Sequence, residues 1–162
     1  MRRTQGSMGA AHLECVNPIK NKWHVRFDFK EDEDGQVSYM EEEFKGKPSI
    51  SEVKDVIVKY YNDLCDEEIR SGLMFEGNQV WLSTENQFNY KSAFDFAFQT
   101  VASGGDFIPV TVKLGTDEEP VYRTFEDIAE LQAFITTCFA HIQGTLAKYW
   151  AIKDSTDFTK YQ

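Results

Sequence analysis

The sequence predicts an α+β fold of three successive ββα units, in which antiparallel hairpins pack with helices and a long helix lies near the end of the chain. Two patterns lead to this prediction. Segments in which apolar and polar residues alternate come in pairs around short turns, which is typical of hairpins. Each pair is followed by a segment with apolar residues at helical spacing. This order favours antiparallel sheets covered by helices over a parallel, doubly wound sheet.

The composition is that of a folded, acidic protein. The 162 residues include 17 Lys and Arg against 27 Asp and Glu, which gives a net charge of −10, and 41% of them are hydrophobic. Because this charge repels phosphate backbones, we do not expect nucleic acid as a partner. No segment approaches the ~18 consecutive apolar residues of a spanning helix, so we do not expect membrane insertion.

The N-terminal third predicts an arm and a hairpin. Residues 1–20 are small, polar and aperiodic, and we expect a flexible N-terminal arm there. Alternating runs over 22–31 and 36–44, joined at Asp34-Gly35, predict a hairpin. The acidic residues of this turn have part of the spacing of a calcium-binding loop, but Lys30 stands where that loop needs its first carboxylate. We therefore interpret the segment as an acidic hairpin tip.

A helix follows this hairpin. Ser49 and Glu52 have the spacing of a capping box, and apolar residues at helical spacing continue to about Cys65. The hairpin and the helix together form the N-terminal ββα unit that we expect over residues 21–66. A further short turn of helix is expected to end at Gly72 in the left-handed conformation.

The sequence of the second unit predicts an amphipathic helix. A short hairpin over 73–82 precedes a helix that Ser83 or Thr84 begins and Gly104-Gly105 ends. We expect one face of this helix to be apolar and buried; the residues on it are Phe88, Tyr90, Ala93, Phe94, Ala97, Phe98 and Val101.

The third unit contains the longest helix. Two strands over 107–113 and 120–125 flank an acidic turn, and the last helix is expected over Glu126–Lys153. Together with the second unit it forms an α+β domain that we expect over residues 67–162. Apolar residues in this helix follow the alternating three- and four-residue spacing of a coiled-coil seam. The seam is equally typical of a helix buried in its own domain, and both interpretations remain open.

Self-association through the last helix would place several side chains in an interface. The candidate contact residues are Leu131, Ile135, Ile142 and Tyr149 of the seam, together with Trp81 and Tyr122 if these are exposed.

The sequence contains no recognisable catalytic or metal-binding motif. The three cysteines and three histidines are scattered, without the close ligand pairs of a zinc site, and we expect no metal and no cofactor. Nucleotide-binding glycine loops and nucleophile elbows are also missing. Acid runs such as Glu41-Glu42-Glu43 are interpreted as solvated surface. We therefore expect a protein that is not an enzyme.

One polar cluster supports an alternative. Glu85, Asn86, Asn89 and Lys91 lie close together at a predicted helix start, with Asp95 one turn further on. Such a cluster either caps the helix or binds a small ligand, and with a carboxylate of raised pKa it would suit a hydrolase.

From about Glu67 onward, the chain resembles a small domain of unknown function found in bacteriophage tail and prophage proteins. The resemblance rests on the segments Glu68–Gly77, Trp81–Lys91 and Gly115–Tyr122, and on Trp150 and Lys153 near the end of the last helix. The second and third of these segments are similar to prophage proteins of Bacteroides-type bacteria. The resemblance implies a phage setting and assigns no functional residue.

The leading hypothesis is a non-enzymatic structural or tail-assembly protein of a phage or prophage that acts through protein–protein contacts. Its partners would be tail components, and a second copy bound through the last helix. It would work in the bacterial cytoplasm during assembly or in the virion. The alternative is a small ligand-binding module or hydrolase that uses the cluster from Glu85 to Lys91.

Overall fold

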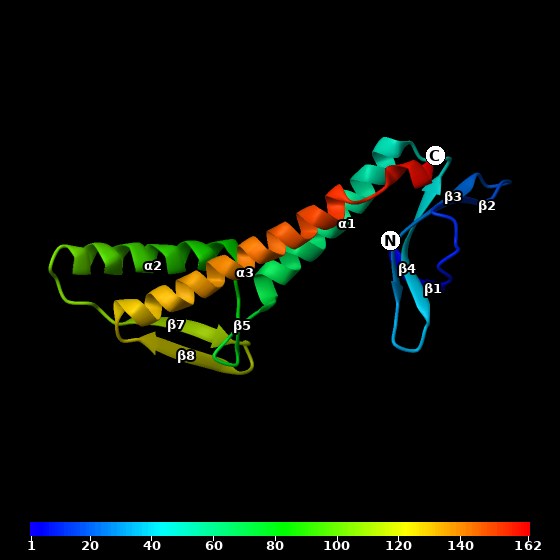
Figure 1. The fold of residues 1–162 in the computed structure, drawn as a ribbon. Coiled ribbons are helices and arrows are strands. Elements are labelled where there is room, and N and C mark those ends of the chain that lie inside the picture. The colour runs from blue at the N-terminus through cyan, green and yellow to red at the C-terminus, as the bar shows by residue number, and fades with distance from the viewer. The chain divides into compact units, whose positions relative to one another are not determined.

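The computed structural model describes residues 1–162 and confirms the α+β class, with antiparallel sheets and a long helix near the C-terminus (Figure 1). Its helices are α1 (Ile50–Ser71), α2 (Thr84–Ala102), α3 (Ile128–Asp154) and the short 3-10 helix η1 (Phe158–Tyr161). Its strands are β1 (Arg2–Gly6), β2 (Leu13–Asn17), β3 (Lys22–Glu31), β4 (Val37–Lys45), β5 (Leu73–Phe75), β6 (Asn78–Val80), β7 (Val110–Gly115) and β8 (Pro120–Phe125).

The chain forms two compact units whose boundary differs from the one expected at 66/67. Residues 1–61 and 153–162 make up the first unit, and residues 62–152 the second, so α1 and α3 contribute to both. The C-terminal residues belong to the first unit because Tyr161 is 3% exposed there and donates a hydrogen bond from its hydroxyl to the Arg26 carbonyl, at 3.1 Å. This pairing joins positions 135 residues apart, which no local pattern indicates.

The first unit corrects the expectation of a flexible arm over residues 1–20. β1 pairs with β4, and β2 pairs with β3, so the predicted hairpin becomes the centre of a four-stranded antiparallel sheet in the order β1-β4-β3-β2. The physical reason is that each edge of a hairpin carries unpaired N–H and C=O groups, and a neighbouring segment satisfies them whatever its side-chain pattern. Gly6 is required in β1, because a Cβ there would lie 2.3 Å from the Tyr39 ring.

A buried ion pair crosses this sheet. Arg26 of β3 and Glu41 of β4 stand opposite each other, are 8% and 6% exposed, and are joined by an Nε–Oε2 hydrogen bond of 3.0 Å. Glu41 also accepts a bond from Arg2 at 3.0 Å and lies 2.9 Å from Nδ1 of His24. Arg26 also contacts Glu14, at 2.6 Å. The expectation that the acid run at 41–43 is solvated is therefore wrong for Glu41.

Asp28 holds a second charged cluster in the same unit. It has a φ of 51° and lies where the β3–β4 register shifts, which marks a bulge. Its carboxylate pairs with Arg3 and accepts a hydrogen bond from the Tyr60 hydroxyl at 2.9 Å. Burial alone would raise the pKa of Asp28, but these bonds outweigh burial and hold the pKa below its ordinary value.

The capping box that begins α1 is confirmed. The Glu52 amide donates to Oγ of Ser49 at 3.3 Å, and the Ser49 amide donates to Oε2 of Glu52 at 2.8 Å. The helix is longer than expected and runs without a break to Ser71. Gly72 ends it, but its φ is not positive, so the expected left-handed cap is wrong. Glycine is needed because a Cβ there would lie 2.5 Å from the Glu68 carbonyl oxygen.

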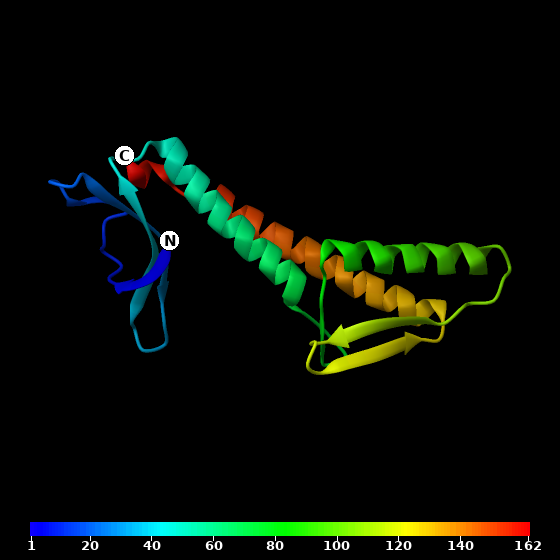
Figure 2. The same cartoon turned by 180° about the vertical axis from the view of Figure 1, so that it is seen from behind.

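The core of the second unit centres on Phe134 of α3, which is fully buried. Its ring lies 5.1 Å from that of Phe75, 5.2 Å from that of Tyr90 on α2 and 5.2 Å from that of Phe125 on β8, measured between centroids. In Figures 1 and 2 the first half of α3 runs between α2 and the hairpin β7–β8. The long helix is therefore the shared element on which the rest of this unit packs.

The hairpins and caps of the second unit agree with the sequence patterns. The pairs β5–β6 and β7–β8 are antiparallel, and Ser83 caps α2 by accepting a hydrogen bond from the Asn86 amide at 3.2 Å. At the other end of α2, Gly104 has a φ of 81° and its amide donates to the Val101 carbonyl. α3 begins at Ile128, after Asp127, whose carboxylate accepts from the Glu130 amide at 2.9 Å.

We expect the buried carboxylate of Glu41 to make the first unit sensitive to acid. Burial alone would raise the pKa of Glu41, but the bonds from Arg2 and Arg26 and the charge of His24 outweigh it and lower the pKa below 4.5. A lowered pKa in the folded state adds stability that is fully present above the unfolded pKa and is lost as the pH falls through the folded pKa. Glu41→Gln should therefore cost about 3 kcal/mol at pH 7 and less below pH 4, in urea unfolding followed by circular dichroism.

The matched control for this variant is Glu43→Gln, which removes an exposed carboxylate of the same strand that contacts Lys22 and His24. It should follow the wild-type curve closely. If the difference between wild type and Glu41→Gln were the same at pH 7 and below pH 4, the ion pair would not be the source of the acid sensitivity.

Phe134→Ala should destabilise the second unit by about 3–5 kcal/mol, because it removes a fully buried ring and leaves a cavity among three other aromatic rings. Phe96→Ala is the control, since Phe96 is 61% exposed and surface substitutions usually change stability by less than about 0.5 kcal/mol. Equal unfolding midpoints for the two variants would contradict a central role for Phe134.

Candidate functional site

Two of the four candidate contact residues in the predicted seam are buried within the protein itself. Leu131 is 1% exposed and Tyr149 is 6% exposed, both within the second unit. The Tyr149 hydroxyl donates to Oε2 of Glu68 at 2.9 Å, and the same carboxylate pairs with Lys148 at 2.6 Å. The expectation that Leu131 and Tyr149 contact a second molecule is therefore wrong, because the seam is used for the unit's own packing. Ile135 and Ile142 are half-buried.

The other two candidate contact residues are exposed. Trp81, which follows β6, is 44% exposed, and Tyr122 of β8 is 69% exposed. The Arg70 guanidinium lies over the Trp81 ring, 5.9 Å from its centroid. Both side chains remain available to a partner or a ligand.

The expected apolar face of α2 is only partly buried. Tyr90 and Ala97 face the core, as predicted, but Phe88 is 69% exposed and Phe98 is 57% exposed. Phe96, on another side of the helix, is 61% exposed. The reason is that α3 and the hairpin β7–β8 cover only a narrow strip of α2, and helical periodicity alone does not show how wide a covered strip is.

An apolar groove lies between α2 and α3, with a volume of about 640 Å³. Phe88 and Phe94 line it from α2; Ile135, Phe139 and Ile142 line it from α3. Phe139 is 62% exposed, and its position beside the predicted seam was the only signal in the sequence that it widens the apolar surface.

The rim of this groove carries one ion pair. Lys91 and Asp95 lie one turn apart on α2 and are hydrogen-bonded to each other. Lys91 therefore belongs to the groove, and not to the ligand site in which the sequence pattern placed it.

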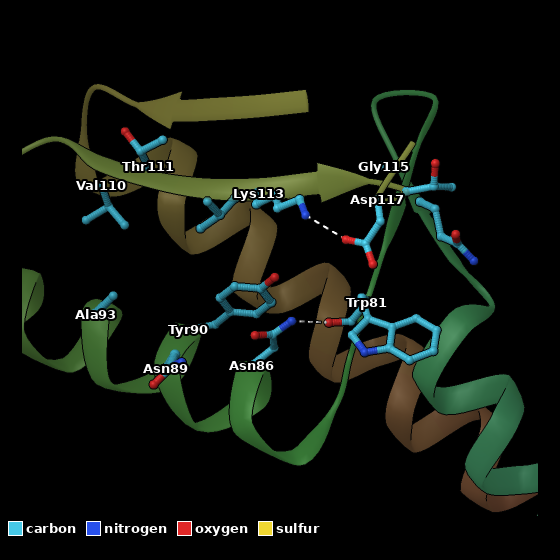
Figure 3. A pocket seen from close by; sticks show the side chains of 13 residues that line it. Trp81, Asn86, Asn89, Tyr90, Ala93, Val110, Thr111, Lys113, Gly115 and Asp117 are labelled. Atoms are coloured by element: carbon cyan, nitrogen blue, oxygen red, sulfur yellow. Dashed lines mark hydrogen bonds and ion pairs between the residues drawn. The ribbon is translucent and has the colours of Figure 1, made fainter. Parts of the chain in front are cut away.

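A second cavity of about 720 Å³ lies between α2 and β7 (Figure 3). Asn86 and Asn89 line it from α2, together with Tyr90, and Lys113 and Asp117 line it from the side of the hairpin. Glu85 is exposed and does not line this cavity. The structure thus brings together two of the four predicted ligand-site residues, and adds residues of β7 and its turn that no local pattern connected to them.

Two side chains of the first turn of α2 anchor the segment that leads into the helix. The Asn86 side-chain amide donates to the Trp81 carbonyl at 2.8 Å, and the Gln87 side-chain amide donates to the Leu82 carbonyl at 2.8 Å. The Asn89 side chain makes no such bond and is exposed. Asn86 therefore both anchors the segment before α2 and lines the cavity, with its side-chain nitrogen bonded and its side-chain carbonyl oxygen without a partner.

The charges in this cavity do not fit hydrolysis by a carboxyl pair. Asp117 is the one carboxylate among the lining residues, and its Oδ1 lies 2.8 Å from Nζ of Lys113. The hydrogen bond from Lys113 lowers the pKa of Asp117 below its ordinary value. General acid catalysis needs a carboxyl group whose pKa is raised, and the cavity contains none.

Other reactive groups are dispersed or buried. No group of three or more His, Cys, Asp or Glu side chains is placed to hold a metal ion. The three cysteines are free, and burial raises the pKa of the Cys138 thiol to about 12, which disfavours the reactive thiolate. None of the helices has both the length and the apolar character that crossing a membrane requires.

No protein-family model, no curated protein and no solved structure matches this chain. The resemblance to phage tail and prophage domains therefore stays a prediction.

Proposed function

We propose that this chain is a non-enzymatic structural protein that self-associates through the groove between α2 and α3. One observation carries the proposal. Phe88 and Phe139 are more than half exposed on the two sides of an apolar groove, and Trp150 is 53% exposed three turns beyond Phe139 on the same side of α3. Large exposed aromatic side chains around a groove are typical of an interaction surface.

The size of this surface supports a second copy as the occupant. An aromatic side chain buries about 150–250 Å² when it is fully covered, and Phe88, Phe139 and Trp150 are 69%, 62% and 53% exposed, so together they offer roughly 280–460 Å². A standard interface buries about 800 Å² on each partner, and the aliphatic side chains in the groove add to the aromatic area. The groove and the neighbouring Trp150 together therefore provide about half of what one protomer contributes to a standard interface.

The charge of the rim also fits a second copy. Lys91 and Asp95 are the two charged residues that line the groove, and they have opposite signs. In a two-fold symmetric dimer the same patch meets itself, so Lys91 of each protomer can face Asp95 of the other. A protein with a net charge of −10 needs such a locally neutral patch to associate with its own copy.

The biological setting belongs to the same proposal. The resemblance of the segment from Glu67 onward to phage tail and prophage domains favours a role in tail assembly, with other tail components as further partners. The protein would then act in the bacterial cytoplasm during assembly or within the virion.

Self-association is tested by light scattering on the full chain at about 50 µM, where micromolar dissociation constants give mostly dimer. We expect twice the chain mass of 18.7 kDa for wild type, and the monomer mass for the double variant Phe88→Asp/Phe139→Asp. Both side chains are exposed, so the variant should retain the wild-type circular dichroism spectrum and unfolding midpoint.

The control is Phe96→Asp, which adds the same charge to α2 at a position that is 61% exposed and does not line the groove. It should remain dimeric. A monomeric wild type, or a double variant that keeps the dimer mass, would refute the proposal.

A further inference from the structure

The Tyr90 hydroxyl has no hydrogen-bond partner within the protein, although only 9% of the residue is exposed. In Figure 3 its ring rises from α2 toward β7, and the hydroxyl lies in the space between them. Burial raises the pKa of this hydroxyl, which therefore stays protonated and remains a donor. The hydroxyl is not one of the fully buried polar atoms that lack a partner, so it is open to the cavity and can donate to water or to a ligand there.

The walls of the cavity around Tyr90 are both polar and aromatic. Asn86 leaves its side-chain carbonyl oxygen without a partner, and Asn89 leaves its whole amide free. Trp81 lines the same cavity with its indole 44% exposed. The Arg70 guanidinium lies over this ring, 5.9 Å from its centroid.

The electrostatics of the cavity favour a neutral ligand. Lys113 and Asp117 are its only charged lining residues, and they are paired at 2.8 Å. The side chain of Asp117 is 93% exposed, so this pair is a surface pair, and its two opposite charges leave the lining without a net charge that would attract an anion or a cation. A wholly apolar ligand would leave the amides of Asn86 and Asn89 and the Tyr90 hydroxyl unsatisfied.

From these observations we propose that the cavity between α2 and β7 binds a neutral sugar unit. A pyranose ring has an apolar face that can stack on Trp81. Its hydroxyl groups both donate and accept, which matches the donor of Tyr90, the acceptor of Asn86 and the mixed amide of Asn89. The volume of about 720 Å³ lies within the range of small-molecule sites, so it accommodates one sugar unit and part of a second.

Binding is tested on the ¹⁵N-labelled full chain by NMR, with the methyl glycosides of glucose, galactose, mannose and N-acetylglucosamine added separately. Each is raised to about 100 mM, which detects dissociation constants in the millimolar range. We expect at least one glycoside to shift the Trp81 indole N–H and the side-chain amides of Asn86 and Asn89 in a saturable way. If none of the four does so, the proposal is overturned.

Two variants assign the binding to this cavity. Trp81→Ala removes the stacking surface and should weaken the affinity at least ten-fold. Asn89→Ala removes the free amide and should weaken it several-fold, and Asn89 is exposed, so the fold should not change. Shifts that persist unchanged in both variants would place the sugar elsewhere and overturn the proposal.

Tyr90→Phe tests whether the Tyr90 hydroxyl binds a ligand or stabilises the fold. It keeps the ring that packs 5.2 Å from that of Phe134 and removes only the unpaired hydroxyl. We expect the affinity for the glycoside to fall several-fold while the thermal midpoint stays the same, because a hydroxyl without a partner in the protein contributes no bond to the fold. A midpoint lowered by more than about 3 °C would show that the hydroxyl is bonded within the protein, and would overturn its assignment to a ligand.

The sugar site and the dimer interface can fail independently. Phe88→Asp/Phe139→Asp changes the groove and not the cavity, so it should bind the glycoside with wild-type affinity. Tyr90 lines both the cavity and the groove, so the light-scattering mass of Tyr90→Phe is measured as well and should equal that of wild type.

Discussion

The packing of Phe134 between α2 and the hairpin β7–β8 is the contact on which the second unit depends. Its ring meets Phe75, Tyr90 and Phe125, which come from three different elements. Because residues three and four apart lie on the same side of a helix, turning Phe134 inward also turns Leu131 and Cys138 inward. The stripe with Phe139 and Trp150 then faces outward. One packing choice thus accounts for both the buried strip of α3 and its exposed aromatic side chains.

The same arrangement explains why α2 borders two hollows of opposite character. On the side where it meets α3, its neighbours are aliphatic and aromatic, and the groove is apolar. On the side where it diverges from β7, its neighbours are the backbone and polar side chains of an edge strand, so the cavity combines amides, a hydroxyl and an ion pair with one indole. Tyr90 lies between the two, with its ring in the core and its hydroxyl in the cavity.

In the first unit the organising constraint is electrostatic. Arg26 and Glu41 are costly to bury, and each is compensated by further partners: Glu14 and the Ala11 carbonyl for the guanidinium, Arg2 and His24 for the carboxylate. A shift of the β3–β4 register by one residue would turn one of the two charges to the other face of the sheet and separate the pair. Arg2 lies in the outer strand β1 and Glu14 in the outer strand β2. Charged residues from the segment expected to be a flexible arm therefore belong to the same ion-pair network.

Sequence patterns alone determined the α+β class, the hairpins at residues 22–45, 73–80 and 110–125, the caps at Ser49 and Ser83, and the last helix. Periodicity, turns and capping are local properties, so they can be read from short segments. They also placed Asn86 and Asn89 together, because residues three apart are neighbours on one side of a helix.

Tertiary structure alone decided that residues 2–6 and 13–17 become strands and that Glu41 is buried. It also decided that Leu131 and Tyr149 belong to the core, and that Lys113 and Asp117 line the same cavity as Asn86. Edge pairing and the covered side of an amphipathic helix depend on partners distant in the chain, and for this reason no local pattern reveals them.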